Sequence, residues 1–216
     1  MKRGTRANIQ KSFVPGAPLA RGFFQQSPVA CARAMIGSEL LWRGCGGIIV
    51  ETEAYSVLGD EACHTFSRPS SRRFVADHPP GTAYIYLNYG VHWLLNFLVK
   101  GGPEEGFVLI RALEPTRRIA QMRARRMSTN PVRLCSGPGK LTQALGIDGS
   151  FHGLDFLATN ILSVSHPKSI PSVLEAKRIG ISKATGLLWR FGLDGSPHLS
   201  TPMTKNPRAL RIPEHC

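Results

Sequence analysis

The sequence predicts one mixed α/β domain of the α+β type, with a curved, largely antiparallel sheet and surrounding helices. Apolar strand-like runs separated by glycine turn signals, and helix starts marked by proline, both favour this class. A length of 216 residues suits a single compact domain with at most a tail. We expect a basic arm at residues 1–24, the main domain at 25–200 and a basic tail at 201–216.

The first elements follow from cap and turn residues. Ser27 followed by Pro28 is typical of an N-cap with proline at the first helical position, and it opens a helix that ends at Gly37. Two apolar runs, 39–43 and 47–53, come next, and the glycines between them predict an antiparallel strand pair.

Three further strand candidates lie in the middle of the chain, at 83–89, 92–100 and 107–113. Gly90 and the segment 101–103 separate them as turns. Together with the first pair they predict a five-stranded sheet, and late strands are expected at 178–182 and 187–191.

Two helices are predicted after the sheet. Pro115 indicates the start of an arginine-rich helix, which faces phosphates or is simply solvated. Residues 136–140, Ser-Gly-Pro-Gly-Lys, predict a second helix whose free amides lie beside Lys140, a fair anion site. Leu141 stands where a Walker A loop needs Ser or Thr, so this is not a P-loop.

The charge balance favours a polyanionic partner. Lys and Arg number 27 against 14 Asp and Glu, a formal charge of +13, which is typical of proteins that bind nucleic acid. A basic surface kept for solubility is the alternative. Neither a run of ~20 apolar residues nor the apolar segment of a signal peptide is visible, so a soluble cytoplasmic protein is expected, with no membrane partner.

Cysteine and histidine spacing gives no support for a metal centre. The five cysteines form no C-x-x-C pair, and the seven histidines lack metal-ligand spacing. We therefore expect free thiols, no metal and no cofactor.

The strongest chemical signal is an acidic pair followed by clustered tyrosines. On a strand, Glu51 and Glu53 project to one face and Thr52 to the other. Spacing alone is equally typical of a solvated strand end. The four tyrosines, at positions 55, 84, 86 and 89, favour a pocket that stacks on a nucleobase, although strand tyrosines are more often core residues.

Three more residues have chemical interest. Tyr89 precedes Gly90 at a turn tip, where a ring can wedge into a base stack or be merely exposed. Asn96 interrupts an apolar run and is either a strand tie or a specificity group. Arg111 follows a second apolar run and needs an anionic partner, either Glu53 or a phosphate, with Glu114 as the alternative.

Five segments together resemble the alkyladenine (3-methyladenine) DNA glycosylase family over about residues 25–200. They are residues 49–55 (IVETEAY), 60–64 (DEACH), 80–90 (PGTAYIYLNYG), 108–115 (VLIRALEP) and 136–141 (SGPGKL).

The resemblance implies a monofunctional glycosylase that projects a hairpin into DNA and flips out a damaged purine. It implies that Glu53 is the general base, with Arg111 as its partner. The base pocket is implied to contain Tyr55, His64, Tyr86, Asn96 as gatekeeper and the backbone amide of Ala62. Tyr89 is implied to be the intercalating wedge. Arg72, Arg73 and Lys140 are candidate contacts to the DNA backbone.

The function expected from these residues is hydrolytic excision of alkylated purines of the 3-methyladenine and 7-methylguanine type, and of hypoxanthine. The partner is double-stranded DNA, bound by a monomer, near the nucleoid if the source is bacterial. Two other hypotheses stay open: a noncatalytic nucleic-acid-binding protein with the same fold, and a module directed to RNA.

Overall fold

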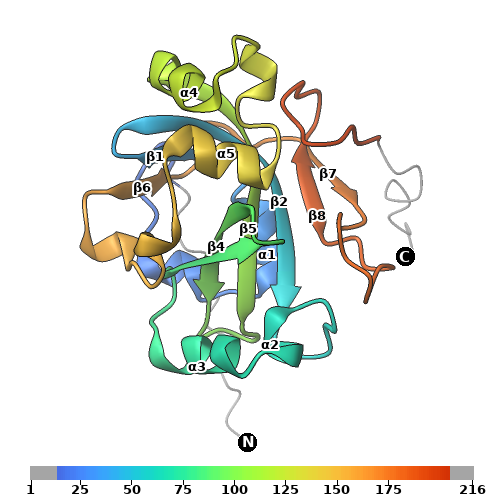
Figure 1. Ribbon diagram of the computed structural model, residues 1–216. Helices are drawn as coiled ribbons and strands as arrows, with labels where there is room; N and C mark the ends of the chain where they lie inside the picture. The colour runs from blue at the N-terminus through green and yellow to red at the C-terminus, as the bar shows by residue number, and fades with distance from the viewer. Residues whose placement is uncertain (1–13, 205–216) are drawn as a thin grey trace, which may run out of the picture.

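Strand β2 (Cys45–Ser56) is the centre of the sheet, because three other strands pair with it. The computed structural model describes residues 14–204 (Figure 1). One edge of β2 pairs with β5 (Gly106–Arg117). The other edge pairs first with β1 (Glu39–Trp42) and then, from Glu51 to Glu53, with β8 (Arg190–Leu193). The acidic pair is therefore flanked by β5 and β8.

The eight strands of the sheet described are joined only by antiparallel pairings. The order is β3-β4-β5-β2-β1-β6, and β7 joins through β8. The remaining strands are β3 (Ala83–Asn88), β4 (His92–Val99), β6 (Leu162–Ser165) and β7 (Val173–Ala176). The predicted mixed α/β class with an antiparallel sheet is confirmed.

The late part of the chain differs from the prediction. Residues 178–182 form a loop and not a strand, because Arg178 turns into the protein interior and leaves the sheet. The predicted strand at 187–191 begins only at Arg190, and β6 and β7 were not predicted.

Within residues 14–204, five α-helices and four short 3-10 helices surround the sheet. The helices are α1 (Pro28–Ala34), α2 (His64–Ser67), α3 (Pro69–Asp77), α4 (Ile119–Arg126) and α5 (Pro138–Leu145). The 3-10 helices are η1 (Arg21–Phe24), η2 (Pro131–Arg133), η3 (Gly149–Phe151) and η4 (Phe156–Ala158). In Figure 1, α1 lies behind the sheet and α5 in front of it. The predicted cap of α1 is confirmed, since Ser27 Oγ accepts a hydrogen bond from the Ala30 N–H at 3.2 Å.

The predicted start of the basic helix at Pro115 is wrong. Pro115 still belongs to β5, beside a shift in register with β2 at Gly46 and Gly47. An interrupted ladder tolerates the missing N–H of proline. The chain turns only at Arg118, which has a φ of 54°, and α4 begins at Ile119.

Two hydrophobic clusters fill the interior. The larger one, which includes Trp42, Phe24 and Phe97, joins α1 and α5 to the sheet. The smaller one packs α2 and α3 against β3 to β5 through residues that include Phe74 and Tyr84. The smaller cluster supports the aromatic residues of the site described below.

Strands β3 and β4 form the predicted hairpin, with Asn88 opposite His92. Its turn residues, Tyr89 and Gly90, both have positive φ, at 49° and 69°. Three residues, 89–91, connect the strands, and the Val91 N–H donates to Asn88 O at 3.1 Å, which closes a β-turn with positive φ at both central positions. Tyr89 is 85% exposed, so the structure confirms its place at the turn tip.

The ends of the chain are described only in part. Residues 1–13 of the predicted arm and 205–216 of the predicted tail lie outside the described residues. The rest of the arm packs on the domain: Leu19 N donates to Val164 O at 2.8 Å, and Phe24 is fully buried. Between residues 14 and 204, no helix is long and apolar enough to cross a membrane.

Candidate active site

A cavity of about 380 Å³ lies between the sheet and the loops at 57–63 and 177–184. Its lining includes most of the residues that the sequence singled out. They are Tyr55, Ala62, His64, Tyr84, Tyr86, Tyr89, Asn96 and Arg111, together with Pro138 from the start of α5 and residues 179–183.

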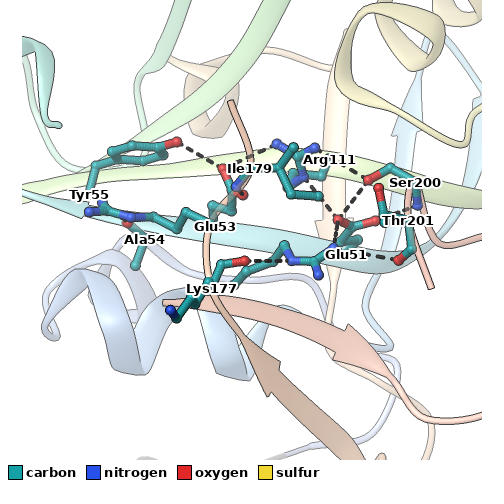
Figure 2. A network of polar contacts seen from close by, with 11 residues as sticks. Glu51, Glu53, Ala54, Tyr55, Arg111, Lys177, Ile179, Ser200 and Thr201 are labelled. Atoms are coloured by element: carbon teal, nitrogen blue, oxygen red, sulfur yellow. Dashed lines mark hydrogen bonds and ion pairs between the residues drawn. The ribbon is translucent and has the colours of Figure 1, made fainter. Parts of the chain in front are cut away.

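Glu51 and Glu53 are fully buried and do not themselves line the cavity, but Glu53 contacts three residues that do, Tyr55, Arg111 and Ile179. Thr52 points the other way, where its Oγ1 donates to Ala32 O of α1 at 2.8 Å. The predicted alternation is therefore confirmed. The alternative of a solvated strand end is wrong, because both carboxylates have partners inside the protein (Figure 2).

Glu53 is held by three groups. Its Oε1 accepts a hydrogen bond from the Ile179 N–H at 2.7 Å, and its Oε2 accepts one from the Tyr55 hydroxyl at 2.8 Å. Arg111 Nη1 lies 3.2 Å from the same Oε2. Burial raises the pKa of Glu53, while Arg111, the Ile179 amide and Tyr55 oppose that rise. A carboxylate with a raised pKa and fixed orientation is suited to accept a proton near neutral pH.

Arg111 reaches both carboxylates because it lies at an irregularity of the sheet. The register pairs Glu51 with Ala112 and Thr52 with Ile110, so Arg111 has no partner in β2. Such bulges redirect a side chain and are common beside active sites. Its Nε donates to Glu51 Oε1 at 2.9 Å. The predicted pairing of Arg111 with Glu53 is confirmed. Arg111 also pairs with Glu51, which sequence reasoning missed, and not with the alternative partner Glu114.

Aromatic rings line the cavity beside Glu53. The rings of His64 and Tyr86 lie 4.3 Å apart, and His64 Nδ1 lies 3.0 Å from the Tyr84 hydroxyl. Burial, and then the charge of Arg68, lowers the pKa of His64 to about 4. Burial has the opposite effect on the Tyr86 hydroxyl, because it raises the pKa of that group. These rings therefore carry no charge at neutral pH.

Ala62 and Asn96 both line the cavity, as the resemblance implies. The Ala62 N–H donates to Asp60 Oδ1 at 3.1 Å. Asn96 Nδ2 donates to Tyr84 O at 3.0 Å, across the β3–β4 pair. The acceptor Oδ1 of Asn96 is the group that it can offer the cavity.

Arg178 and Asp60 form a buried ion pair that sequence reasoning missed. Arg178 Nη1 and Nη2 donate to the two Asp60 oxygens at 2.6 and 2.8 Å, and neither side chain is accessible to solvent. The guanidinium also lies 4.6 Å from the centre of the Tyr55 ring. In the sequence, 118 residues separate Arg178 from Asp60, so nothing local indicates that the two side chains pair.

The predicted DNA-backbone residues lie around this region. Arg73 and Lys140 are exposed, and Lys140 is in the first turn of α5, two residues after Pro138 of the cavity. Arg72 is exposed but its Nη1 donates to Thr65 O at 2.6 Å.

The described residues contain no group of His, Cys, Asp or Glu side chains placed to hold a metal ion. The four cysteines between 14 and 204 are free and buried, and Cys216 is outside the described residues.

Comparison with known proteins gives one consistent result. The family model described as methylpurine-DNA glycosylase (MPG) matches residues 22–197. A protein of Rhodopseudomonas palustris named "Putative 3-methyladenine DNA glycosylase" is 45% identical over 190 residues, which cover 88% of this chain and 91% of that protein. A protein of the same name from Nitrosospira multiformis is 46% identical, over 83% of this chain and 92% of that protein. Another, from Agrobacterium fabrum, is 40% identical, over 93% of this chain and 100% of that protein. The chain therefore belongs to the methylpurine-DNA glycosylase family, and it is a hydrolase that acts on N-glycosyl bonds in DNA.

Proposed function

We propose that the protein is a monofunctional DNA glycosylase that flips a damaged purine nucleotide into the cavity and hydrolyses its N-glycosyl bond. The substrates proposed are purines alkylated at N3 or N7, of the 3-methyladenine and 7-methylguanine type, and the deaminated purine hypoxanthine. The product is an abasic site, with both DNA strands intact. The protein acts as a monomer.

The observation that carries this proposal is the buried Glu53 carboxylate at an aromatic-lined cavity. Fixed by the Ile179 amide, the Tyr55 hydroxyl and Arg111, it is poised to take a proton from a water molecule. The water oxygen bonds to C1′ of the sugar, the N-glycosyl bond breaks, and the base leaves with the bonding electrons. One carboxylate suffices for a purine alkylated at N3 or N7, because that base carries positive charge and leaves as a neutral molecule. Hypoxanthine is neutral in the nucleotide, so it leaves as an anion, which takes up a proton from solvent.

The uncharged rings of His64 and Tyr86 in the cavity wall fit a cationic purine. With its pKa near 4, His64 is uncharged at neutral pH and does not repel an alkylated base. The Tyr86 ring beside it presents a π face, which attracts a bound cation. Asn96 lines the cavity and its Nδ2 is used by Tyr84 O, so its carbonyl is the group that can meet a purine edge, which supports its proposed role as gatekeeper.

Tyr89 is proposed as the wedge that fills the gap left by the flipped nucleotide. It lines the cavity and is 85% exposed, on a turn where a Cβ added at Gly90 would meet no atom within 4 Å. An exposed aromatic ring on a strongly basic protein suits insertion between stacked bases. Arg72, Arg73 and Lys140 are proposed to bind the flanking phosphates.

Product analysis tests the proposal. The protein is incubated with duplexes that carry hypoxanthine or with DNA methylated at purines, and released bases are identified by chromatography. We expect free damaged base and strands that break only after alkali. Strand cleavage without alkali would refute the monofunctional assignment. Tight binding without release of any base would favour the noncatalytic DNA-binding alternative.

A further inference from the structure

A buried polar network behind Glu53 extends from Glu51 to the C-terminal part of the described chain (Figure 2). Glu51 Oε1 accepts hydrogen bonds from Arg111 Nε at 2.9 Å, from Arg190 Nη1 at 3.1 Å and from the Ser200 hydroxyl at 2.8 Å. Glu51 Oε2 accepts one from the Ser200 N–H at 2.5 Å. Ser200 lies beyond residues 22–197, which the family model matches.

Ser200 also contacts Arg111 directly. Arg111 Nη2 donates to the Ser200 Oγ at 3.3 Å, while that hydroxyl donates to Glu51. An arginine that meets a carboxylate commonly forms two parallel hydrogen bonds with its two oxygens. Here the Ser200 oxygen takes the place of the second carboxylate oxygen, because Glu51 Oε2 is already used by the Ser200 amide.

The consequence concerns the orientation of the guanidinium. With Nε on Glu51 and Nη2 on Ser200, the remaining Nη1 faces Glu53 at 3.2 Å. Two carboxylates and two arginines, Arg111 and Arg190, make the buried cluster electrically balanced. Without the serine hydroxyl, Arg111 Nη2 loses its partner, and the guanidinium is held less firmly in the orientation that directs Nη1 at Glu53.

We propose that Ser200 is a positioning residue: through Glu51 and Arg111 it fixes the orientation of the Glu53 carboxylate. This inference rests on the proposed function in taking Glu53 as the general base. Ser200 itself does not line the cavity.

The test compares Ser200→Ala with Ser200→Thr, which keeps the hydroxyl. The matched control is Thr201→Ala, since Thr201 enters the network only through its backbone carbonyl, 3.5 Å from Arg190 Nη1. Single-turnover base release is measured over a range of pH on a hypoxanthine duplex. We expect Ser200→Ala to slow release about tenfold, with the acid limb of its pH profile shifted upward and duplex affinity unchanged. Ser200→Thr and Thr201→Ala should stay within about twofold of the wild type.

A second readout needs no activity. The Glu53 carboxyl is titrated by ¹³C NMR in the free protein, where it faces Arg111, Glu51, Tyr55 and, more distantly, Tyr86. We expect its pKa to rise by about half a unit or more in Ser200→Ala, because the facing cation is held less firmly. An unchanged pKa of Glu53 in Ser200→Ala would overturn the inference. Base release by Ser200→Ala at the wild-type rate would also overturn it, and so would release by Ser200→Thr that is as slow as release by Ser200→Ala. Failure of the wild type to release base would refute the proposed function and leave the titration result to decide this inference.

Discussion

Asp60 and Arg178 form a bidentate ion pair that joins the two loops on either side of the cavity, and both side chains are fully buried. Asp60 also accepts hydrogen bonds from the Ser56 and Ala62 amides. Arg178 directly precedes Ile179, whose amide holds Glu53. The pair therefore fixes one wall of the cavity and one partner of the candidate general base.

Asp60→Asn should destabilise the protein by about 3 kcal/mol or more, because it leaves the Arg178 charge buried without its counter-ion. Urea denaturation at neutral pH measures this loss. The matched control is Glu61→Gln, since Glu61 and Lys183 join the same two loops at 3.7 Å but are about half and two-thirds exposed. Its cost should stay below about 1 kcal/mol. Equally small losses in both variants would show that the buried pair does not hold the loops.

Tyr89→Asn should stabilise the protein and impair excision. Tyr89 adopts a φ of 49°, a left-handed conformation that asparagine tolerates better than tyrosine, so unfolding free energy should rise by about 0.5–1 kcal/mol. Excision should fall about tenfold, since the ring proposed to fill the vacated gap is lost.

The control for this variant is Arg43→Asn, which changes another residue of positive φ before a glycine, in the β1–β2 turn. Its excision rate should equal that of the wild type. Thermal unfolding and single-turnover kinetics on one substrate separate the two effects. Excision by Tyr89→Asn at the wild-type rate would exclude the wedge role.

The lowered pKa of His64 predicts how the stability of the protein depends on pH. Its pKa is about 4 in the folded protein against 6.5 ordinarily, so between these values the unfolded chain binds more protons. The contribution of neutral His64 is therefore complete above pH 6.5 and is lost as the pH falls toward 4.

We expect the wild type to lose more stability than His64→Gln on going from about pH 7.5 to about pH 5. Urea denaturation at the two pH values checks this difference. Parallel losses in the two proteins would contradict the burial of a neutral imidazole at the cavity.

Local signals predicted the local parts of the fold. The Ser27 cap, the β3–β4 hairpin with Tyr89 at its tip and the start of α5 each depend on a few adjacent residues. The alternation of Glu51 and Glu53 was likewise readable from strand geometry, and the resemblance placed Tyr55, His64, Tyr86 and Asn96 together, as the cavity does.

The rest depends on contacts between distant residues. Arg178 pairs with Asp60 across 118 residues, and Arg190 with Glu51 across 139, so no periodicity reveals them. The strand prediction for residues 178–182 was wrong for the same reason. Ile179 and Ile181 alternate as strand residues do, but the distant Asp60 holds Arg178 in the interior and the segment forms a loop. The hydrogen bond from the Ala62 amide to Asp60 was not predicted, because Asp60 is fixed by that distant arginine.

The most direct test of the central claim is release of free base from a duplex containing hypoxanthine or a methylated purine, by the wild type and by Glu53→Gln, in EDTA. Glutamine keeps the size of the side chain but cannot accept the proton of water. We predict release by the wild type alone, with duplex binding retained by Glu53→Gln. Turnover by Glu53→Gln at the wild-type rate would contradict the assignment of Glu53 as the general base.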